Sequence, residues 1–453
     1  MARLDAHRLG RRLAELVATY DVPGASVAVL ADDEVVEAAA GVVNLRTGVA
    51  TTPDSPFQVQ SVTKLWTATL VLQLVDEGKI SLDDPVRRHL PRFRTSDEEQ
   101  SAAITVRHLL THTGGFEGDL WPDVRDDRRR LGELVDKHVA NAPQHLPPGH
   151  LYSYCSAGMG VLGRLVEVTL GLSYDAALRR RLAEPLGVRG LAVDAGEALA
   201  HRSAIGHLDA RAGQPARPLR TWSPMPASNP AAGNTLAMPA SGLVALARMH
   251  LADGIGPGGL RLLSRESARL MRTPHVAVPA SEGARQGLGW RLPVTGVAEH
   301  GGDAIGCGAM LRTVPDAGVA VAVLVNGGAM AALVSILCAE LLDDLVTLPG
   351  PPEVPATTGA DPASYVGRYA LRNEVSEVTT DAAGRLWLTR TERDEAVATA
   401  TRAGEVLTPV TVELRRLAGE QFVRVDANGD AAGRVEFVEG GRFLHSGRAA
   451  PRV

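Results

Sequence analysis

Ser61 and Lys64 are spaced so that they could act together as a nucleophile and its base. They lie in the segment Q-V-Q-S-V-T-K (residues 58–64), and the apolar residues that follow predict a long buried helix beginning near Ser61. Three residues along a helix is about one turn, so the lysine amine could reach the serine hydroxyl. A serine needs such a base at neutral pH, and the free N–H groups of a helix N-terminus stabilise developing negative charge. The spacing therefore predicts a serine that forms an acyl-enzyme.

The lysine content of the chain supports this interpretation of Lys64. The sequence contains three lysines, Lys64, Lys79 and Lys137, and arginine provides nearly all the other cations. Arginine keeps its proton, whereas a desolvated lysine can lose its proton and act as a base. The alternative is an ordinary helix-capping serine followed by a surface lysine.

A second segment contains two closely spaced tyrosines. Residues 148–163 read P-G-H-L-Y-S-Y-C-S-A-G-M-G-V-L-G, which resembles the Y-x-N region of class C β-lactamases, related esterases and D-peptidases. The resemblance implies that Tyr154 transfers protons between the nucleophile and the leaving group. Ser156 stands where the family usually has asparagine, and its hydroxyl could still bind a substrate carbonyl. Tyr152 is the alternative for the catalytic tyrosine, or else a buried core residue.

A third segment, E-H-G-G-D (residues 299–303), resembles the K-T-G or H-x-G strand of the same family. Glycines at Gly301 and Gly302 would let a substrate backbone lie against the strand edge. By the resemblance, the N–H groups of Ser61 and Asp303 form the oxyanion hole. His300 would line the site as a hydrogen-bond donor or electrostatic partner. Taken alone, this motif could also be a simple turn.

Together these segments resemble the serine β-lactamase and penicillin-binding protein superfamily over roughly residues 10–346. Two further matches, L-L-T-H-T-G-G (residues 109–115) and E-G-K-I-S-L-D-D (residues 77–84), are interpreted as structural. The resemblance implies an α/β (α+β) fold of the β-lactamase/transpeptidase type, in which helices flank an antiparallel sheet. The expected organisation is a catalytic domain (1–350) with a helical subdomain at about 91–200, a Pro-rich linker (351–361) and a small C-terminal antiparallel β domain (362–453), barrel-like and resembling a lipocalin.

Local patterns predict the elements of the main sheet. Residues 25–30 and 35–42 read as strands joined by a turn, preceded by an amphipathic helix within residues 1–20. Residues 317–339 carry no charge and are long enough to cross a bilayer. A β-branched run, an N-G-G turn and a helically spaced stretch that ends near residue 346 favour a strand, a turn and a helix instead.

Composition excludes several classes of protein. The chain has 453 residues, is 45% hydrophobic and 22% charged, and carries a formal charge of -5, which fits a soluble globular protein. The sequence contains no run of basic residues that could bind along a phosphate backbone, so nucleic acid is not an expected partner. Charges throughout residues 1–20 interrupt any signal-peptide core, so we expect a cytoplasmic protein without membrane association. The widely spaced Cys155, Cys307 and Cys338 suit neither disulfides nor zinc, and no metal or cofactor is expected.

The resemblance fixes the mechanism better than the substrate. Acylation of Ser61 is followed by attack of water, which gives a hydrolase, or of an amine, which gives a cyclase. The expected function is a stand-alone penicillin-binding-protein-type thioesterase that takes a peptidyl group from a carrier protein and releases a macrocyclic nonribosomal peptide. An esterase or D-stereospecific peptidase is the main alternative, and an inactive binding protein of the same fold is the other. The oligomeric state stays open.

Three further residues are candidates for substrate binding. Arg448, in a G-R pair near the chain end, could clamp a peptide carboxylate through its planar guanidinium, or could simply be a solvated terminal arginine. Trp222 and Asn234 flank a Pro-rich loop and are candidate pocket residues.

Overall fold

The main sheet of the protein is built around two strands that are buried along their whole length. The computed structural model describes residues 5–124, 129–210, 215–293, 296–348, 361–426 and 428–453. All residues of β1 (Gly24–Ala31) and β13 (Val319–Val325) are buried, as expected of continuous apolar runs covered on both faces. The two strands pair antiparallel and in unbroken register from Ala25 opposite Val325 to Leu30 opposite Ala320.

Nine antiparallel strands form this sheet, in the order β3-β2-β1-β13-β12-β11-β10-β9-β8. The remaining strands are β2 (Glu34–Asn44), β3 (Val49–Ala50), β8 (Val276–Ala277), β9 (Arg285–Gln286), β10 (Arg291–Leu292), β11 (Ala298–Ala304) and β12 (Cys307–Val314). Two short pairs lie outside it, β4 (Phe57–Gln58) with β7 (Ala237–Met238) and β5 (His207–Leu208) with β6 (Arg217–Pro218).

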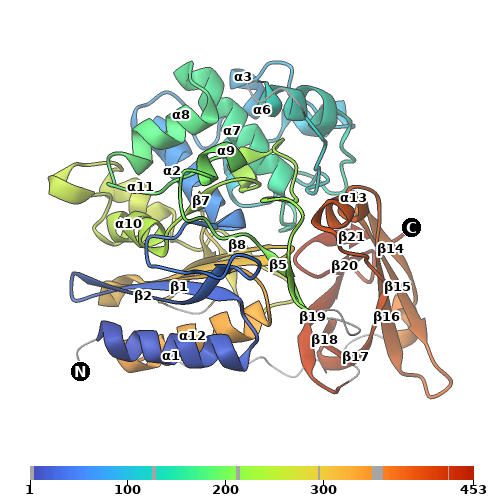
Figure 1. Ribbon diagram of the computed structural model, residues 1–453. Helices are drawn as coiled ribbons and strands as arrows, with labels where there is room; N and C mark the ends of the chain where they lie inside the picture. Colours follow the sequence, from blue (N-terminus) through green and yellow to red (C-terminus); the bar gives the residue numbers. More distant parts are fainter. Residues whose placement is uncertain (1–4, 125–128, 211–214, 294–295, 349–360, 427) are drawn as a thin grey trace.

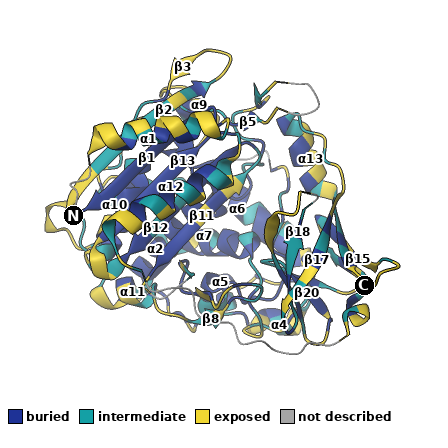
Figure 2. Cartoon of the chain, turned by 90° about the horizontal axis from the view of Figure 1, so that it is seen from below, coloured by how far each residue is buried: buried dark blue, intermediate teal, exposed yellow. Residues whose placement is uncertain are grey.

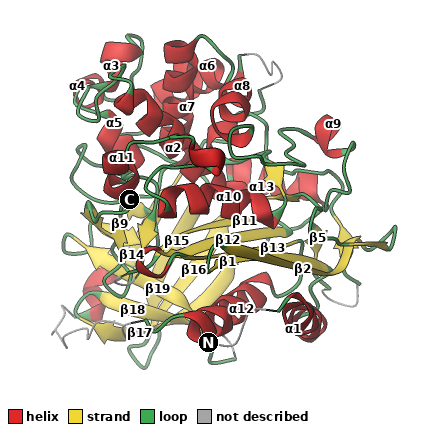
Figure 3. Cartoon of the chain, turned by 90° about the vertical axis from the view of Figure 1, so that its left-hand side faces the viewer, coloured by secondary structure: helices red, strands yellow, loops and turns green. Residues whose placement is uncertain are grey.

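Helices cover both faces of the main sheet (Figures 1 and 3). One face packs against α1 (Ala6–Thr19) and α12 (Met330–Leu345) through a valine- and leucine-rich cluster. Figure 2 shows these two helices in front of the buried strands. The charge-free stretch considered as a membrane span is thus β13, a turn and the first part of α12, as predicted. Within the described residues, no helix is both long and apolar enough to cross a membrane.

The opposite face carries the larger core and the helical subdomain. Its central helix α2 (Thr63–Asp76) is buried for most of its length. The other α-helices there are α3 (Val86–His89), α4 (Glu98–Ala102), α5 (Val106–Leu110), α6 (Arg130–Glu133), α7 (Ser156–Leu170), α8 (Tyr174–Leu178), α9 (Ala195–Ala198), α10 (Ala240–Leu251) and α11 (Arg265–Leu270). The predicted start of the long helix near Ser61 is slightly displaced, because a 3-10 turn (Gln60–Val62) precedes α2.

The C-terminal region forms a second, eight-stranded antiparallel sheet, drawn in red in Figure 1. A bridge between Tyr369 and Arg452 brings its first and last strands together, so the sheet is nearly closed and barrel-like, as predicted. The boundaries of this domain stay a prediction, and the Pro-rich linker lies almost wholly outside the described residues. The strands are β14 (Gly367–Leu371), β15 (Glu374–Thr380), β16 (Leu386–Glu392), β17 (Val410–Ala418), β18 (Gln421–Val425), β19 (Ala431–Val438), β20 (Phe443–His445) and β21 (Ala449–Pro451).

One helix in this region departs from the all-β expectation. Helix α13 (Asp394–Ala403) lies between β16 and β17. It buries Ala396, Ala400 and Ala403 on one side and ends at Gly404, whose φ of 88° is the left-handed conformation typical of a helix end. Its buried residues are mostly alanines, whose helical spacing gives only a weak apolar signal in the sequence.

Candidate active site

A cleft of about 940 Å³ lies where the catalytic domain meets the C-terminal sheet. The helical subdomain contributes Tyr152 and Tyr154 to its lining, and the C-terminal sheet contributes Gly447 and Arg448. Ser61 and the whole predicted motif from His300 to Asp303 also line it. A larger pocket of about 1040 Å³ lies elsewhere and is lined by none of these residues. The three sequence segments therefore converge on one cleft, as predicted.

Ser61 lies in a tight turn whose backbone is held close to a neighbouring loop. Gln60 has a φ of 47°, and the backbone of Gly233 approaches it so closely that a Cβ there would lie 1.8 Å from the Gln60 carbonyl oxygen. The turn leads directly into α2, which carries Lys64 on the same side. Lys64 Nζ donates to Ser61 Oγ at 2.8 Å and to the Ala232 carbonyl at 3.0 Å. The predicted nucleophile and base are thus hydrogen-bonded.

The amine of Lys64 is suited to accept a proton. Its side chain is 1% exposed, and burial is the main reason that its pKa falls from 10.5 to about 7. Repulsion by Arg448 lowers this pKa further, whereas Asp119 and Cys155 oppose the shift. A substantial fraction of Lys64 is therefore uncharged at neutral pH and can take the proton of Ser61.

Tyr154 is the tyrosine that reaches the nucleophile. Burial raises its pKa to about 12, and a hydrogen-bonding contact with Ser61 opposes that shift. The centroid of its ring lies 4.9 Å from Lys64 Nζ and 5.1 Å from the Arg448 guanidinium, and the permanently charged Arg448 makes a cation–π interaction there. Tyr154 therefore carries its proton at neutral pH and can donate it to a departing group.

Backbone hydrogen bonds hold Tyr154 between two parts of the molecule. Its N–H donates to the Gly447 carbonyl at 3.0 Å, which ties it to the C-terminal sheet. On the other side, the His112 carbonyl accepts from Ser153 at 2.9 Å, and His112 Nδ1 accepts from the N–H of Cys155 at 3.2 Å. The His112 ring also packs on the Tyr154 ring, with centroids 4.6 Å apart. The segment at residues 109–115, interpreted as structural, thus supports the catalytic tyrosine directly.

Strand β11 runs against the nucleophile turn at Gly302. A Cβ on Gly302 would lie 2.3 Å from the Val59 carbonyl oxygen and 3.1 Å from the backbone nitrogen of Ser61. Only glycine permits this approach, which brings the backbone preceding Asp303 beside the N–H of Ser61. The oxyanion hole formed by Ser61 and Asp303 stays a prediction, and this proximity supports it.

His300 has a different hydrogen-bonding role from the expected one. Burial and the neighbouring Lys64 lower its pKa to about 3, so the ring is neutral. Its Nδ1 lies 2.7 Å from the Gly301 carbonyl, which can only accept, so the single N–H is used there. His300 therefore offers an acceptor nitrogen to the cleft in place of the expected donor or charge.

Asp119 belongs to the site and was missed by the sequence reasoning. Its carboxylate holds the Arg448 guanidinium through two contacts, Nη2 to Oδ1 at 2.9 Å and Nε to Oδ2 at 2.6 Å. Burial raises the pKa of Asp119, and Arg448 opposes that rise. Asp119 belongs to no recognisable sequence motif, and nothing in the linear sequence indicates that it contacts Arg448.

The other predicted substrate-binding residues are more remote. Ser156 is the first residue of α7, and its carbonyl accepts from Asn229 at 2.8 Å, but it does not line the cleft. Asn234 donates to the Pro226 carbonyl at 2.6 Å. Trp222 packs against a cluster of alanines. Neither Trp222 nor Asn234 lines the cleft. Their contacts are with residues of the surrounding loop and its neighbours.

Comparisons with known proteins assign the chain to a family. The family model described as Beta-lactamase matches residues 9–334. Penicillin-binding protein 4 of Amycolatopsis lactamdurans is 40% identical over 361 residues, which cover 77% of this chain and 93% of that protein. The chain belongs to the beta-lactamase family, and it is a serine hydrolase of the β-lactamase and penicillin-binding protein type.

Other relatives differ in how much of the chain they match. Esterase EstB of Burkholderia gladioli is 36% identical over 164 residues, 33% of this chain and 42% of EstB. A solved structure described as SurE is 29% identical, with a TM-score of 0.77 and 99% of both chains covered. A structure of SurE with D-Leu has the same identity and coverage and a TM-score of 0.75. The similarity to SurE thus includes the C-terminal sheet as well as the catalytic domain.

Proposed function

We propose that the protein is a thioesterase and peptide cyclase that accepts a peptidyl group from a carrier-bound thioester. The observation that carries the proposal is the composition of the cleft, in which Gly447 and Arg448 of the C-terminal sheet lie beside Ser61 and Tyr154. Similarity to SurE over 99% of both chains, and the D-leucine in one SurE structure, support a peptidyl substrate with a D-configured end.

In the first step, Ser61 Oγ attacks the thioester carbonyl while Lys64 accepts its proton. A bond forms between Oγ and the carbonyl carbon, and the N–H groups at Ser61 and Asp303 would stabilise the resulting oxyanion. The carbon–sulfur bond then breaks. The departing thiolate takes the proton of Tyr154, which Lys64 replenishes, and the peptide remains as an ester on Ser61.

In the second step, the amine at the other end of the same peptide attacks the ester. The carbon–nitrogen bond forms, the ester bond to Ser61 breaks, and the amine proton passes through Tyr154 and Lys64 back to Ser61 Oγ. A second macromolecule is not needed at this stage. The cyclic product therefore leaves with the enzyme in its initial state.

Hydrolysis is the second candidate outcome, since the same acyl-enzyme can be attacked by water. The partial similarity to esterase EstB favours it. An inactive binding protein is disfavoured because Ser61, Lys64 and Tyr154 are all present and in contact.

Incubation with a linear peptidyl N-acetylcysteamine thioester, followed by mass spectrometry, tests the proposal. We expect a product that lacks one water relative to the linear acid, formed faster from a D- than from an L-configured C-terminal residue and absent with Ser61→Ala. Free acid as the sole product would reject cyclisation and leave the hydrolase.

A further inference from the structure

Arg291 is a cation of the active-site cleft that has no partner among the described residues. It begins β10, is exposed, and lines the cleft together with Tyr152 and His300. In the described parts of the chain its side chain makes neither a hydrogen bond nor an ion pair. Its charge is close enough to influence the pKa of Tyr152 and that of His300.

Two acidic residues of the site, Glu299 and Asp119, are already engaged by other arginines. Glu299, the cross-strand neighbour of Arg291, accepts from Arg312 Nε at 2.7 Å. On the other side of the cleft, Asp119 binds Arg448 through two contacts. The charge of Arg448, the arginine expected to clamp a carboxylate, is therefore balanced within the protein. Arg291 is the cleft arginine whose charge is not balanced by a described residue.

The pairing of strands β10 and β11 indicates how far Arg291 lies from the nucleophile Ser61. Strand β10 pairs with β11 at a single position, Arg291 opposite Glu299. Beyond that point, residues 301–303 of β11 pair with β12 on one side and, among the described residues, with no strand on the other. Three residues of an extended strand span about 10 Å, so Arg291, opposite Glu299, lies about that far along β11 from Gly302. Gly302 adjoins the backbone of Ser61.

We infer that Arg291 determines specificity by binding an anionic group of the acyl donor, about 10 Å from the carbonyl that Ser61 attacks. The inference rests on the proposed function only in taking the substrate to be an extended acyl donor, whose acyl chain or leaving group lies near β11. A planar guanidinium binds carboxylates and phosphates through paired hydrogen bonds. The anion could be a carboxylate in the peptide or the phosphate of a carrier's phosphopantetheine arm.

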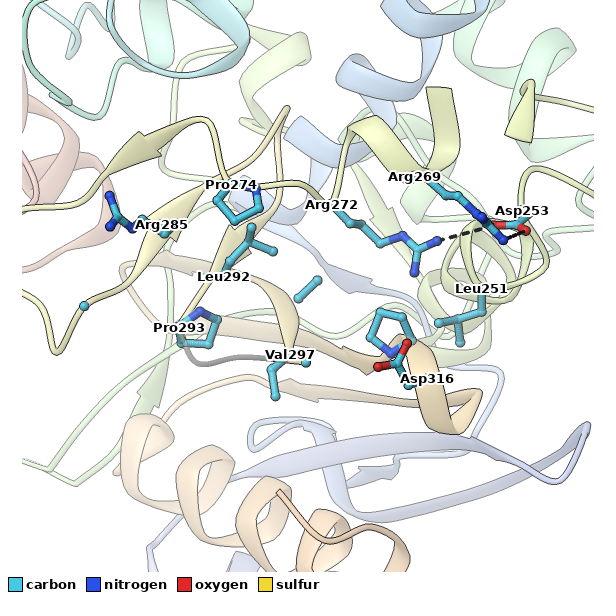
Figure 4. A pocket seen from close by; sticks show the side chains of 14 residues that line it. Leu251, Asp253, Arg269, Arg272, Pro274, Arg285, Leu292, Pro293, Val297 and Asp316 are labelled. Carbon is cyan, nitrogen blue, oxygen red and sulfur yellow. Dashed lines mark hydrogen bonds and ion pairs between the residues drawn. The ribbon is translucent and has the colours of Figure 1, made fainter. Parts of the chain in front are cut away.

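Arg285 provides a matched control on the neighbouring strand. It is also exposed, its side chain also lacks a hydrogen bond or ion pair with any described residue, and it lies in β9, which pairs with β10. Arg285 pairs in register with Leu292 and Arg291 with Gln286, so the two arginines point to opposite sides of the sheet. Figure 4 shows Arg285 in the larger pocket, on the side away from the ion pair of Arg269 with Asp253.

The test measures acylation rates with p-nitrophenyl esters of short peptides that carry Glu or Gln at successive positions from the reacting carbonyl. We expect the wild type to favour Glu at one position by about tenfold or more in kcat/KM. Arg291→Gln should bring this ratio to about one, Arg291→Lys should restore part of it, and Arg285→Gln should leave it as in the wild type. Thermal unfolding checks that each variant is folded.

A second arm replaces the peptide carboxylate by a phosphate, with a neutral acyl chain on pantetheine or on phosphopantetheine. A preference that depends on Arg291 in either arm supports the inference and identifies the source of the anion. Ratios that are equal in the wild type and Arg291→Gln in both arms would overturn it. Release of p-nitrophenol in the first arm, and of free thiol in the second, reports acylation whether the acyl-enzyme later hydrolyses or cyclises. Failure of the cyclase proposal would therefore be distinguishable from failure of this inference.

Discussion

Arg448 of the C-terminal sheet and Asp119 of the helical subdomain form a bidentate ion pair beside the catalytic lysine. The two residues are 329 positions apart in the sequence, and their atoms are 2.9 Å apart at Nη2 and Oδ1. Arg448 lowers the pKa of Lys64 and Asp119 raises it. The pair therefore joins the two parts of the molecule and also sets the charge around the base.

The first prediction concerns the pH dependence of acylation. The base acts in its uncharged form, so kcat/KM of the wild type should rise with pH through an apparent pKa of about 7. Arg448→Met removes the repelling cation, so this rising limb should move to higher pH. Asp119→Asn removes the stabilising anion, so the limb should move to lower pH. Shifts in the same direction for both variants would contradict the account.

The second prediction concerns Tyr154. Tyr154→Phe removes the proton donor while keeping the ring, so kcat/KM should fall by about 10²–10⁴-fold. The matched variant Tyr152→Phe changes a tyrosine that also lines the cleft and should lose far less activity. Steady-state kinetics on an ester substrate check both. An equally large loss of activity in Tyr152→Phe would contradict the assignment of proton transfer to Tyr154.

The third prediction is that the catalytic lysine reduces stability. Lys64 titrates at about 7 in the folded protein and at 10.5 when unperturbed, so the unfolded chain binds more protons between these values. Stability of the wild type should therefore rise with pH across this window. Lys64→Met lacks that dependence, and its advantage in unfolding free energy should be greatest at pH 7 and below.

Urea unfolding of both proteins at pH 7 and pH 10 measures this difference. The advantage of Lys64→Met should shrink by a few kcal/mol between the two, since one pKa unit corresponds to about 1.4 kcal/mol. Lys137→Met, which changes an exposed lysine, should show no comparable change. A pH-independent difference for Lys64→Met would mean that the buried amine carries its charge at no cost.

The fourth prediction concerns the contact between β11 and the nucleophile turn. Gly302→Ala places a methyl group 2.3 Å from the Val59 carbonyl oxygen, so Ser61 must move, and we expect a loss of activity of about 100-fold or more. Gly301→Ala is the control, because the nearest atom to its new methyl is Met310 Cε at 3.4 Å, ordinary van der Waals contact. Equal activities of the two variants would argue against this contact.

The local parts of the fold and site could be predicted from the sequence. Ser61 and Lys64 are one helical turn apart, so their contact follows from helix geometry alone. Strands β1 and β13 could be predicted from continuous apolar runs, and helix α12 from its helically spaced apolar residues. Tyr154 and the segment at His300 could be placed only by resemblance to a family, since their proximity to Ser61 depends on the whole fold.

The rest depends on contacts that no linear pattern records. Asp119 gains its role from an arginine in another domain. Among the described residues the Arg291 side chain has no ion-pair partner, and the neighbouring Glu299 binds Arg312, a pairing that depends on the folded sheet. His300 was expected to be a donor or an electrostatic partner, whereas in the fold its N–H is directed to the adjacent Gly301 carbonyl, a contact that the sequence does not indicate.

The central claim is that Ser61 is a nucleophile activated by Lys64, and covalent labelling tests it most directly. Intact-mass spectrometry after treatment with a fluorophosphonate should show one adduct on the wild type, at Ser61. The adduct should be absent from Ser61→Ala and form far more slowly in Lys64→Met. An unlabelled wild type, or an adduct that persists in Ser61→Ala, would contradict the account.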